Sequence, residues 1–130
     1  MKLHRRWPAL AGALVVSSAV LAAPPSVQLV SPTLTAVSQD SSVQCTIVNL
    51  SARDQSVEIW MYNSLGEAVG HNWITVVPGG SGGVSMPHDS YPAVSHCRFL
   101  VPDGRSAADF RASISVLKFD YGIIATLPAY

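Results

Sequence analysis

The sequence predicts an all-β protein, an antiparallel sandwich of about seven or eight short strands. Apolar and polar residues alternate in several runs, as strands with one buried face require. Turn signals rich in Gly, Pro, Asn and Asp recur about every 8 to 12 residues between these runs. No stretch beyond the N-terminal segment shows a convincing helical period, which favours a sandwich over a mixed fold.

The first predicted strand is kinked, because Pro32 interrupts residues 27–37 and proline cannot donate to a central ladder. The later strands are predicted at residues 41–50, 57–62, 68–77, 84–86, 96–101, 110–116 and 123–127. Turns are predicted at residues 63–66, 102–105 and 120–122, with a glycine-rich loop at Pro78–Gly83. Within the turn at 102–105 we expect Gly104 to adopt a positive φ.

Residues 1–22 have the layout of a secretory signal peptide. Lys2, Arg5 and Arg6 precede an apolar run from Trp7 to Ala22, and cleavage after Ala22 would leave small residues at the recognition positions. The alternative is an uncleaved membrane anchor, but the run is shorter than the ~20 residues that a bilayer span needs. We therefore expect an exported protein, periplasmic or extracellular, with one domain at residues 23–130 and no membrane span after removal of the signal.

The charge of the mature chain argues against a nucleic-acid partner. The leader holds three of the eight basic residues and none of the eight acidic ones, which leaves five basic residues against eight acidic ones in the remaining 108 residues. Phosphate binding needs clustered lysine and arginine. A chain of this length has room for a single core and no second domain.

The chain has two cysteines, Cys45 and Cys97, each in an alternating run. In an oxidising compartment they predict one disulfide between distant strands, the alternative being two free thiols. Such a bridge closes a loop of 51 residues, which the chain-entropy model values at about 4 kcal/mol. No Cys-x-x-Cys pair is present, so the predicted role of the disulfide is structural.

Cys45, the aromatic Trp60 in the following strand and the distant Cys97 resemble the pattern of an immunoglobulin-like sandwich. Ser95 stands where the tyrosine corner of true immunoglobulin domains would be. More specifically, the chain resembles a group of small exported bacterial proteins of unknown role. That resemblance rests on Cys45-Thr-Ile-Val-Asn, Cys97-Arg-Phe, Arg111-Ala-Ser and Ala125-Thr-Leu-Pro. It implies the fold but no activity.

A Gly-x-Ser-x-Gly motif is centred on Ser81, with Asp89 and His96 downstream in the order of a hydrolase triad. A nucleophile elbow needs a strand before the serine, a helix after it and a large α/β sheet. Here the motif falls between two predicted strands of a short all-β chain. We therefore expect no enzyme activity and expect the glycines to serve loop flexibility.

Met86, His88 and His71 are residue types that bind copper. A blue-copper site would need a free thiolate followed by histidine and methionine, and neither residue follows Cys97. The sequence therefore predicts no metal site and no cofactor. Asn49-Leu50-Ser51 is a formal glycosylation acceptor.

Two groups of residues form a candidate partner surface. If Val57, Ile59 and Met61 face the core, Trp60 and Tyr62 face solvent as an aromatic strip. In the opposite register, which the immunoglobulin pattern implies, Trp60 packs against the disulfide. Both registers fit the sequence.

The second group is His88, Asp89 and Tyr91 in Pro87–Ala93, the longest predicted irregular segment, for which a plain connector is the alternative. The predicted function is an exported, non-enzymatic binding module for an unidentified partner, such as another exported protein or a cell-surface component. The alternative is a subunit that docks by β-strand addition.

Overall fold

The computed structural model describes residues 26–35, 41–118, 120 and 122–130, apart from residues 88–93. The predicted signal peptide, residues 1–22, lies outside this part of the chain. The described strands are β1 (Val27–Val30), β2 (Leu34–Thr35), β3 (Ser41–Asn49), β4 (Gln55–Asn63), β5 (Ala68–Val76), β6 (Ser81–Pro87), β7 (Val94–Val101), β8 (Phe110–Lys118) and β9 (Gly122–Pro128). One 3-10 turn, η1 (Ala107–Asp109), precedes β8.

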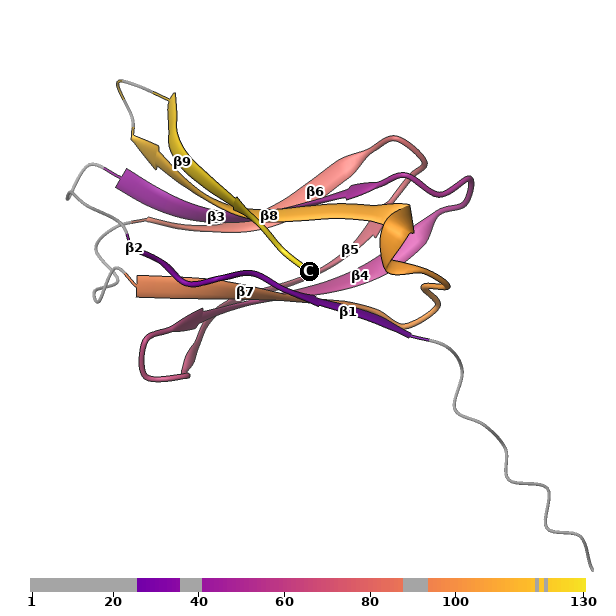
Figure 1. The fold of residues 1–130 in the computed structure, drawn as a ribbon, viewed down its shortest axis with the longest axis horizontal. Helices are drawn as coiled ribbons and strands as arrows, with labels where there is room; N and C mark the ends of the chain where they lie inside the picture. The colour runs from indigo at the N-terminus through magenta and orange to yellow at the C-terminus, as the bar shows by residue number, and fades with distance from the viewer. Residues whose placement is uncertain (1–25, 36–40, 88–93, 119, 121) are drawn as a thin grey trace, which may run out of the picture.

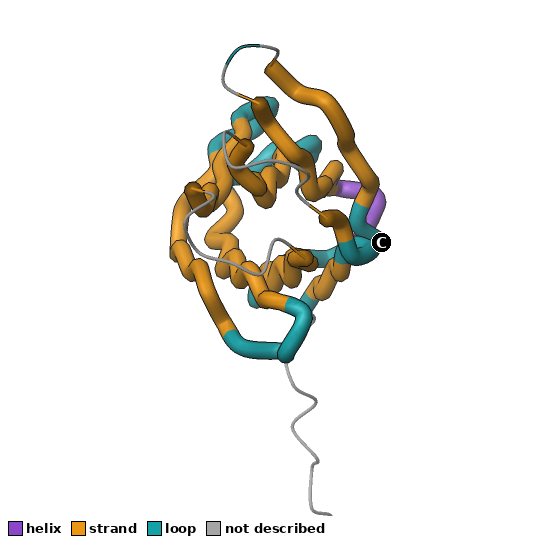
Figure 2. The backbone as a smooth tube through the Cα atoms, turned by 90° about the vertical axis from the view of Figure 1, so that its left-hand side faces the viewer, coloured by secondary structure: helices purple, strands orange, loops and turns teal. Residues whose placement is uncertain are grey.

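The strands form two antiparallel sheets, which confirms the predicted sandwich (Figure 1). Sheet A has the order β1-β7-β4-β5, with β2 also paired to β7, and sheet B has the order β6-β3-β8-β9. Viewed at right angles to Figure 1, the two sheets enclose a common interior (Figure 2). The nine described strands exceed the predicted number because the kinked first strand is two strands.

The five central strands, β3 to β7, follow the immunoglobulin order, with one cysteine in each sheet. The outer strands differ from that order. β1 lies beside β7, where the last strand of an immunoglobulin domain lies, and β8 lies beside β3, where the first strand lies. The two ends of the chain therefore exchange sheets relative to the immunoglobulin pattern.

The core consists of the inward positions of both sheets. Val57, Ile59 and Met61 of β4 are fully buried, as are Cys45 and Cys97. The two cysteines form the predicted disulfide between β3 and β7, with their Cα atoms 5.8 Å apart. The bridge thus joins the two sheets through the centre of the core.

Ser31 explains the break in the first strand. Its backbone N–H donates to the Cys97 carbonyl at 2.9 Å, and its Oγ accepts from the Cys97 N–H at 2.7 Å. The side chain therefore takes over the role of a backbone acceptor just before Pro32, so the chain stays attached to β7. At the other end of the chain, Tyr130 exchanges two backbone hydrogen bonds with Val30 and ties sheet B to the edge of sheet A.

Two turn predictions need correction. Pro78–Gly80 form a turn, but residues 81–83 belong to β6. A Cβ on Gly83 would overlap the Cys45 carbonyl oxygen, so this glycine permits close strand approach and does not serve loop flexibility. Gly104 has no positive φ; a Cβ there would come within 2.9 Å of Val27 Cγ2.

The turn predicted at residues 63–66 is confirmed, whereas the turn predicted at residues 120–122 lies only partly within the described residues. Residues 63–66 form a turn in which Gly66 has φ 79° and donates to the Asn63 carbonyl at 3.0 Å. The Asn63 side chain accepts from the N–H groups of Leu65 and Glu67, which fixes this hairpin. Gly122, at the start of β9, has φ 71°.

Candidate binding surface

The outer face of sheet A carries several large side chains among the residues that face away from the core. They alternate with the buried positions, and they are Gln28 and Val30 of β1, His96, Arg98 and Leu100 of β7, Ser56, Glu58, Trp60 and Tyr62 of β4, and His71, Trp73 and Thr75 of β5. Trp73 is 55% exposed. We call these residues the sheet A face.

Four rings on this face lie in contact, and we call His71, Trp60, Tyr62 and His96 the aromatic row. The ring centroids of His71 and Trp60 are 3.8 Å apart with an interplanar angle of 24°. Those of Trp60 and Tyr62 are 6.3 Å apart at 26°, and those of Tyr62 and His96 are 5.1 Å apart at 14°. The rings therefore cover one another's faces and direct their edges outward.

The row crosses three strands because of their register. Trp60 pairs with His71 of β5 on one side and with Arg98 of β7 on the other, and Tyr62 pairs with His96. Side chains directly opposite each other on one face of antiparallel strands are within contact distance. Strand pairing, and not sequence proximity, thus assembles the row.

Polar groups flank the row on both sides. Glu58 Oε1 lies 3.2 Å from His71 Nε2. On β7, directly across from Trp60, Arg98 Nη2 donates to Gln28 Oε1 at 3.1 Å, while Arg98 Nε is buried without a hydrogen-bond partner. The side chains at both flanks of the row therefore make defined contacts.

The structure decides between the two registers of Trp60. Because Val57, Ile59 and Met61 are fully buried, Trp60 lies on the outer face and does not pack against the disulfide as the immunoglobulin pattern implied. Trp60 and Tyr62 were predicted for this surface, whereas His71 and His96 were considered only for a copper site and a catalytic triad, and Arg98 for no site. Their outward positions could be read from the alternation in β5 and β7, but the pairing that gathers them could not.

His88, Asp89 and Tyr91 lie outside the described residues, as does the rest of the irregular segment at 88–93. Their predicted role in a partner surface stays a prediction. β7 follows this segment and begins at Val94.

The hydrolase motif does not assemble from the described residues. Ser81 begins β6 in sheet B and lies at the end of the sandwich where β4 starts. His96 is in sheet A and pairs with Tyr62, close to the opposite end of the sandwich where β4 finishes. At ~3.3 Å per strand residue this separates them by roughly 20 Å. Asp89, the third predicted member, is not among the described residues.

The candidate copper ligands considered from the sequence, Met86 and His71, also lie apart in the structure. Met86 packs against the core from β6, while His71 is on the outer face of β5 stacked on Trp60. His88 lies in the segment that is not described. Within the described ranges, no group of three or more His, Cys, Asp or Glu side chains is arranged to hold a metal ion.

Asn49 is a structural residue in this fold. Its side chain is fully buried, its Nδ2 donates to the carbonyls of Arg53 and Val76, and its Oδ1 accepts from the N–H and hydroxyl of Ser51. The amide thus fixes the turn between β3 and β4. A glycan on Asn49 is incompatible with this arrangement.

The four sheet edges carry features that limit the addition of another strand. Tyr130 covers part of β1, and register shifts mark β5 and β9. Pro128 ends β9, and on β6 the Gly83 carbonyl accepts from Asn72 Nδ2 at 3.1 Å. Bulges, prolines and covered carbonyls are common protections of edge strands. These features give no support to strand addition, which stays a prediction.

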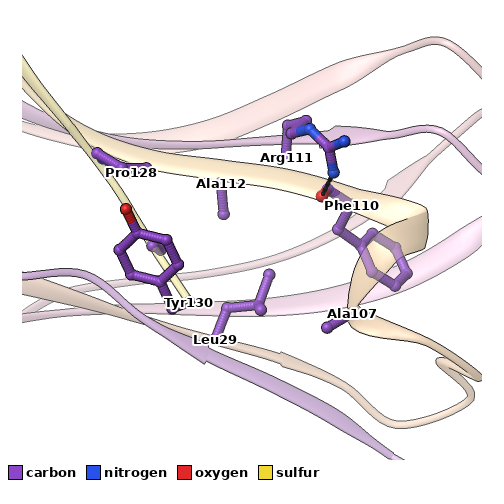
Figure 3. A pocket seen from close by; sticks show the side chains of 8 residues that line it. Leu29, Ala107, Phe110, Arg111, Ala112, Pro128 and Tyr130 are labelled. Atoms are coloured by element: carbon purple, nitrogen blue, oxygen red, sulfur yellow. Dashed lines mark hydrogen bonds between the residues drawn. The ribbon is translucent and has the colours of Figure 1, made fainter.

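A cavity of about 470 Å³ lies at the edge where β1 faces β8 and the C-terminal residues (Figure 3). Leu29, Phe110 and Ala112 line it from the core, and Pro128 and Tyr130 line it from the end of the chain. The guanidinium of Arg111, also in the lining, donates to the Phe110 carbonyl at 2.9 Å. The side chains that line this cavity are mostly apolar, and no cluster of polar groups converges in it.

A comparison of the chain with family models, curated proteins and solved structures gives no match. Among the described residues, no helix has the length and hydropathy to cross a membrane. Inference about function therefore rests on the geometry of the sheet A face.

Proposed function

We propose that this protein is an exported, non-enzymatic binding module that engages a partner through the sheet A face. The observation that supports this proposal is the aromatic row, four stacked rings on the outer side of a sheet whose inner side already forms the core. Large apolar patches on the surface of a folded domain mark interaction sites or ligand-binding grooves.

The composition of the face supports a binding role. Trp, Tyr and Arg are enriched at the centres of interfaces and lysine is depleted there. The sheet A face contains Trp60, Trp73, Tyr62 and Arg98 and has no lysine. Its stacked rings are already ordered, so they lose little side-chain entropy on binding.

Export is supported by the disulfide, since such bonds persist on the oxidising side of a membrane. The basic and apolar layout of residues 1–22 supports the same conclusion. We propose a periplasmic or extracellular location, with another exported protein or a cell-surface component as the partner.

A double variant tests the proposal. Replacing Trp60 and Tyr62 with threonine keeps strand propensity and removes the centre of the row. We expect the native partner, captured from the cells that produce the protein, to be lost with this variant and retained with a matched control, Gln44→Thr with Thr46→Val on the outer face of sheet B. Equal capture by both variants would refute the proposal.

A further inference from the structure

Arg98 is a charged residue of the sheet A face that makes no ion pair. Its side-chain hydrogen bond goes to the neutral amide of Gln28, and no described Asp or Glu lies within ion-pair distance of it. Glu58, the acidic residue of the face, is diagonal to Arg98 in the register of β4 and β7 but is bonded to His71 of β5. The face therefore presents a guanidinium beside the aromatic row with no described carboxylate in contact with it.

The guanidinium is held in place before any partner arrives. Gln28 fixes Nη2, burial of Nε restricts the side chain, and the register places Arg98 between Trp60 and Val30. A planar guanidinium is weakly hydrated and offers donors in a fork that matches a carboxylate. A charge-assisted bond in this setting is shorter and stronger than a neutral one.

We propose, building on the proposed function of the sheet A face, that Arg98 receives a carboxylate from an extended acidic segment of a partner protein. The aromatic row then supplies the apolar contacts beside that ion pair. Charge complementarity defines the chemistry of the partner, since no described carboxylate contacts the guanidinium of Arg98.

Two observations favour a protein segment over a glycan or a large rigid partner. The rings of the row cover one another's faces and offer their edges, whereas sugars stack on open ring faces; of the aromatic residues on this face, Trp73 alone stands outside the described stacking contacts. Sheet A presents four paired strands, β1, β7, β4 and β5, which at ~4.8 Å per strand give a width of about 19 Å. A strip this narrow suits a linear segment.

The test uses the purified, disulfide-bonded protein and two synthetic peptides, one alternating Asp and Leu and one in which Asn replaces each Asp. Binding is followed by the NMR shifts of the Trp60 indole N–H and the Arg98 Nε–H. We expect the Asp peptide to shift both signals saturably and to bind roughly tenfold more tightly than the Asn peptide.

Variants assign the effect to Arg98. Arg98→Gln reduces Asp-peptide binding to the level of the Asn peptide, while Arg98→Lys keeps the charge but loses the fork and binds with intermediate affinity. Arg111→Gln is the matched control, because Arg111 is an exposed arginine whose guanidinium is bonded to backbone carbonyls. It leaves the peptide affinity unchanged.

The outcomes separate this inference from the proposed function. Equal binding of the two peptides at Trp60 would overturn the role of Arg98 and leave the face as a binding surface. No shift at Trp60 or Arg98 with either peptide at millimolar concentration would also overturn the inference. The proposed function is then judged by the partner-capture experiment with the variant at Trp60 and Tyr62.

Discussion

The outer faces of the two sheets share strand geometry but differ in their side chains. The outer face of sheet A carries the aromatic row with Glu58 and Arg98. The middle of the outer face of sheet B carries polar residues without aromatic rings, among them Gln44, Thr46, Ser85, Ser113, Ser115 and Thr126, and the apolar Val48, Leu117 and Ile123 lie toward its ends. The inner sides of both sheets pack against the same apolar core.

The difference shows which outer face carries larger side chains than are needed to cover its sheet. Small polar side chains are sufficient to cover a sheet, as the hydrogen bond between Ser115 Oγ and Thr126 Oγ1 at 2.9 Å illustrates. Large aromatic residues on the opposite face add contact area that the core does not use. The proposed function assigns the sheet A face to a partner, and the outer face of sheet B is the comparison for that proposal.

The disulfide gives the largest expected effect, and it acts on both faces alike because it joins the two sheets. Replacing Cys45 and Cys97 with alanine lowers the free energy of unfolding by about 4 kcal/mol in the chain-entropy model. Urea denaturation measures this loss. A loss below ~1 kcal/mol would show that the sheets are held together without the bridge.

Gly83 tests the structural character of sheet B. In Gly83→Ala the new Cβ overlaps the carbonyl oxygen of Cys45, which belongs to the neighbouring strand and cannot move away freely. We expect a loss of about 3 kcal/mol in unfolding free energy. Gly66→Ala is the control for a glycine without close neighbours, since a Cβ on Gly66 meets nothing within 4 Å. Its loss of unfolding free energy comes only from the positive φ. If Gly83→Ala were the milder of the two, close packing of β3 against β6 would be disproved.

The double variant of Trp60 and Tyr62 tests the other face. Threonine at both positions lowers the unfolding free energy by roughly 1–2 kcal/mol, because half-exposed rings contribute less than core residues. Its sheet B counterpart, Gln44→Thr with Thr46→Val, stays within about 0.5 kcal/mol. Thermal or urea unfolding of both pairs gives the comparison. A collapse of the fold in the Trp60 and Tyr62 variant would assign the row to stability.

Glu58→Gln gives the smallest expected effect. The bond between Glu58 and His71 joins a partly exposed pair, and such pairs contribute well under 1 kcal/mol. We expect a change of less than about 0.5 kcal/mol in unfolding free energy. A loss of 2 kcal/mol or more, roughly the cost of a buried unpaired group, would show that the row depends on this bond.

Alternation and turn chemistry predicted most of the fold. The buried positions of β3 and β7, the break at Pro32 and the hairpin at residues 63–66 follow from local sequence. The disulfide followed from the count of two cysteines. Pairing between distant strands does not follow from local periodicity, so the exchange of β1 and β8 relative to the immunoglobulin order could not be predicted.

The candidate site was predicted only in part for the same reason. Trp60 and Tyr62 stood out, but both faces of β4 are rich in large apolar residues, so the sequence left the register open. His71, His96 and Arg98 become neighbours of these rings only through pairing of β5 and β7 with β4. Gly82 and Gly83 looked like loop residues because the sequence does not show how closely β6 approaches its neighbours.

Site-specific photo-crosslinking tests most directly whether the sheet A face is the binding face. A benzophenone amino acid replaces Trp60 in one protein and Thr46, on the outer face of sheet B, in another, and both are irradiated in the cells that produce the protein. We predict a discrete crosslinked species from position 60 and no such species from position 46. An excess of unlabelled protein competes for the partner and suppresses the crosslink, whereas an excess of the double threonine variant does not. The same crosslinks from both positions, or none from position 60, would contradict the account.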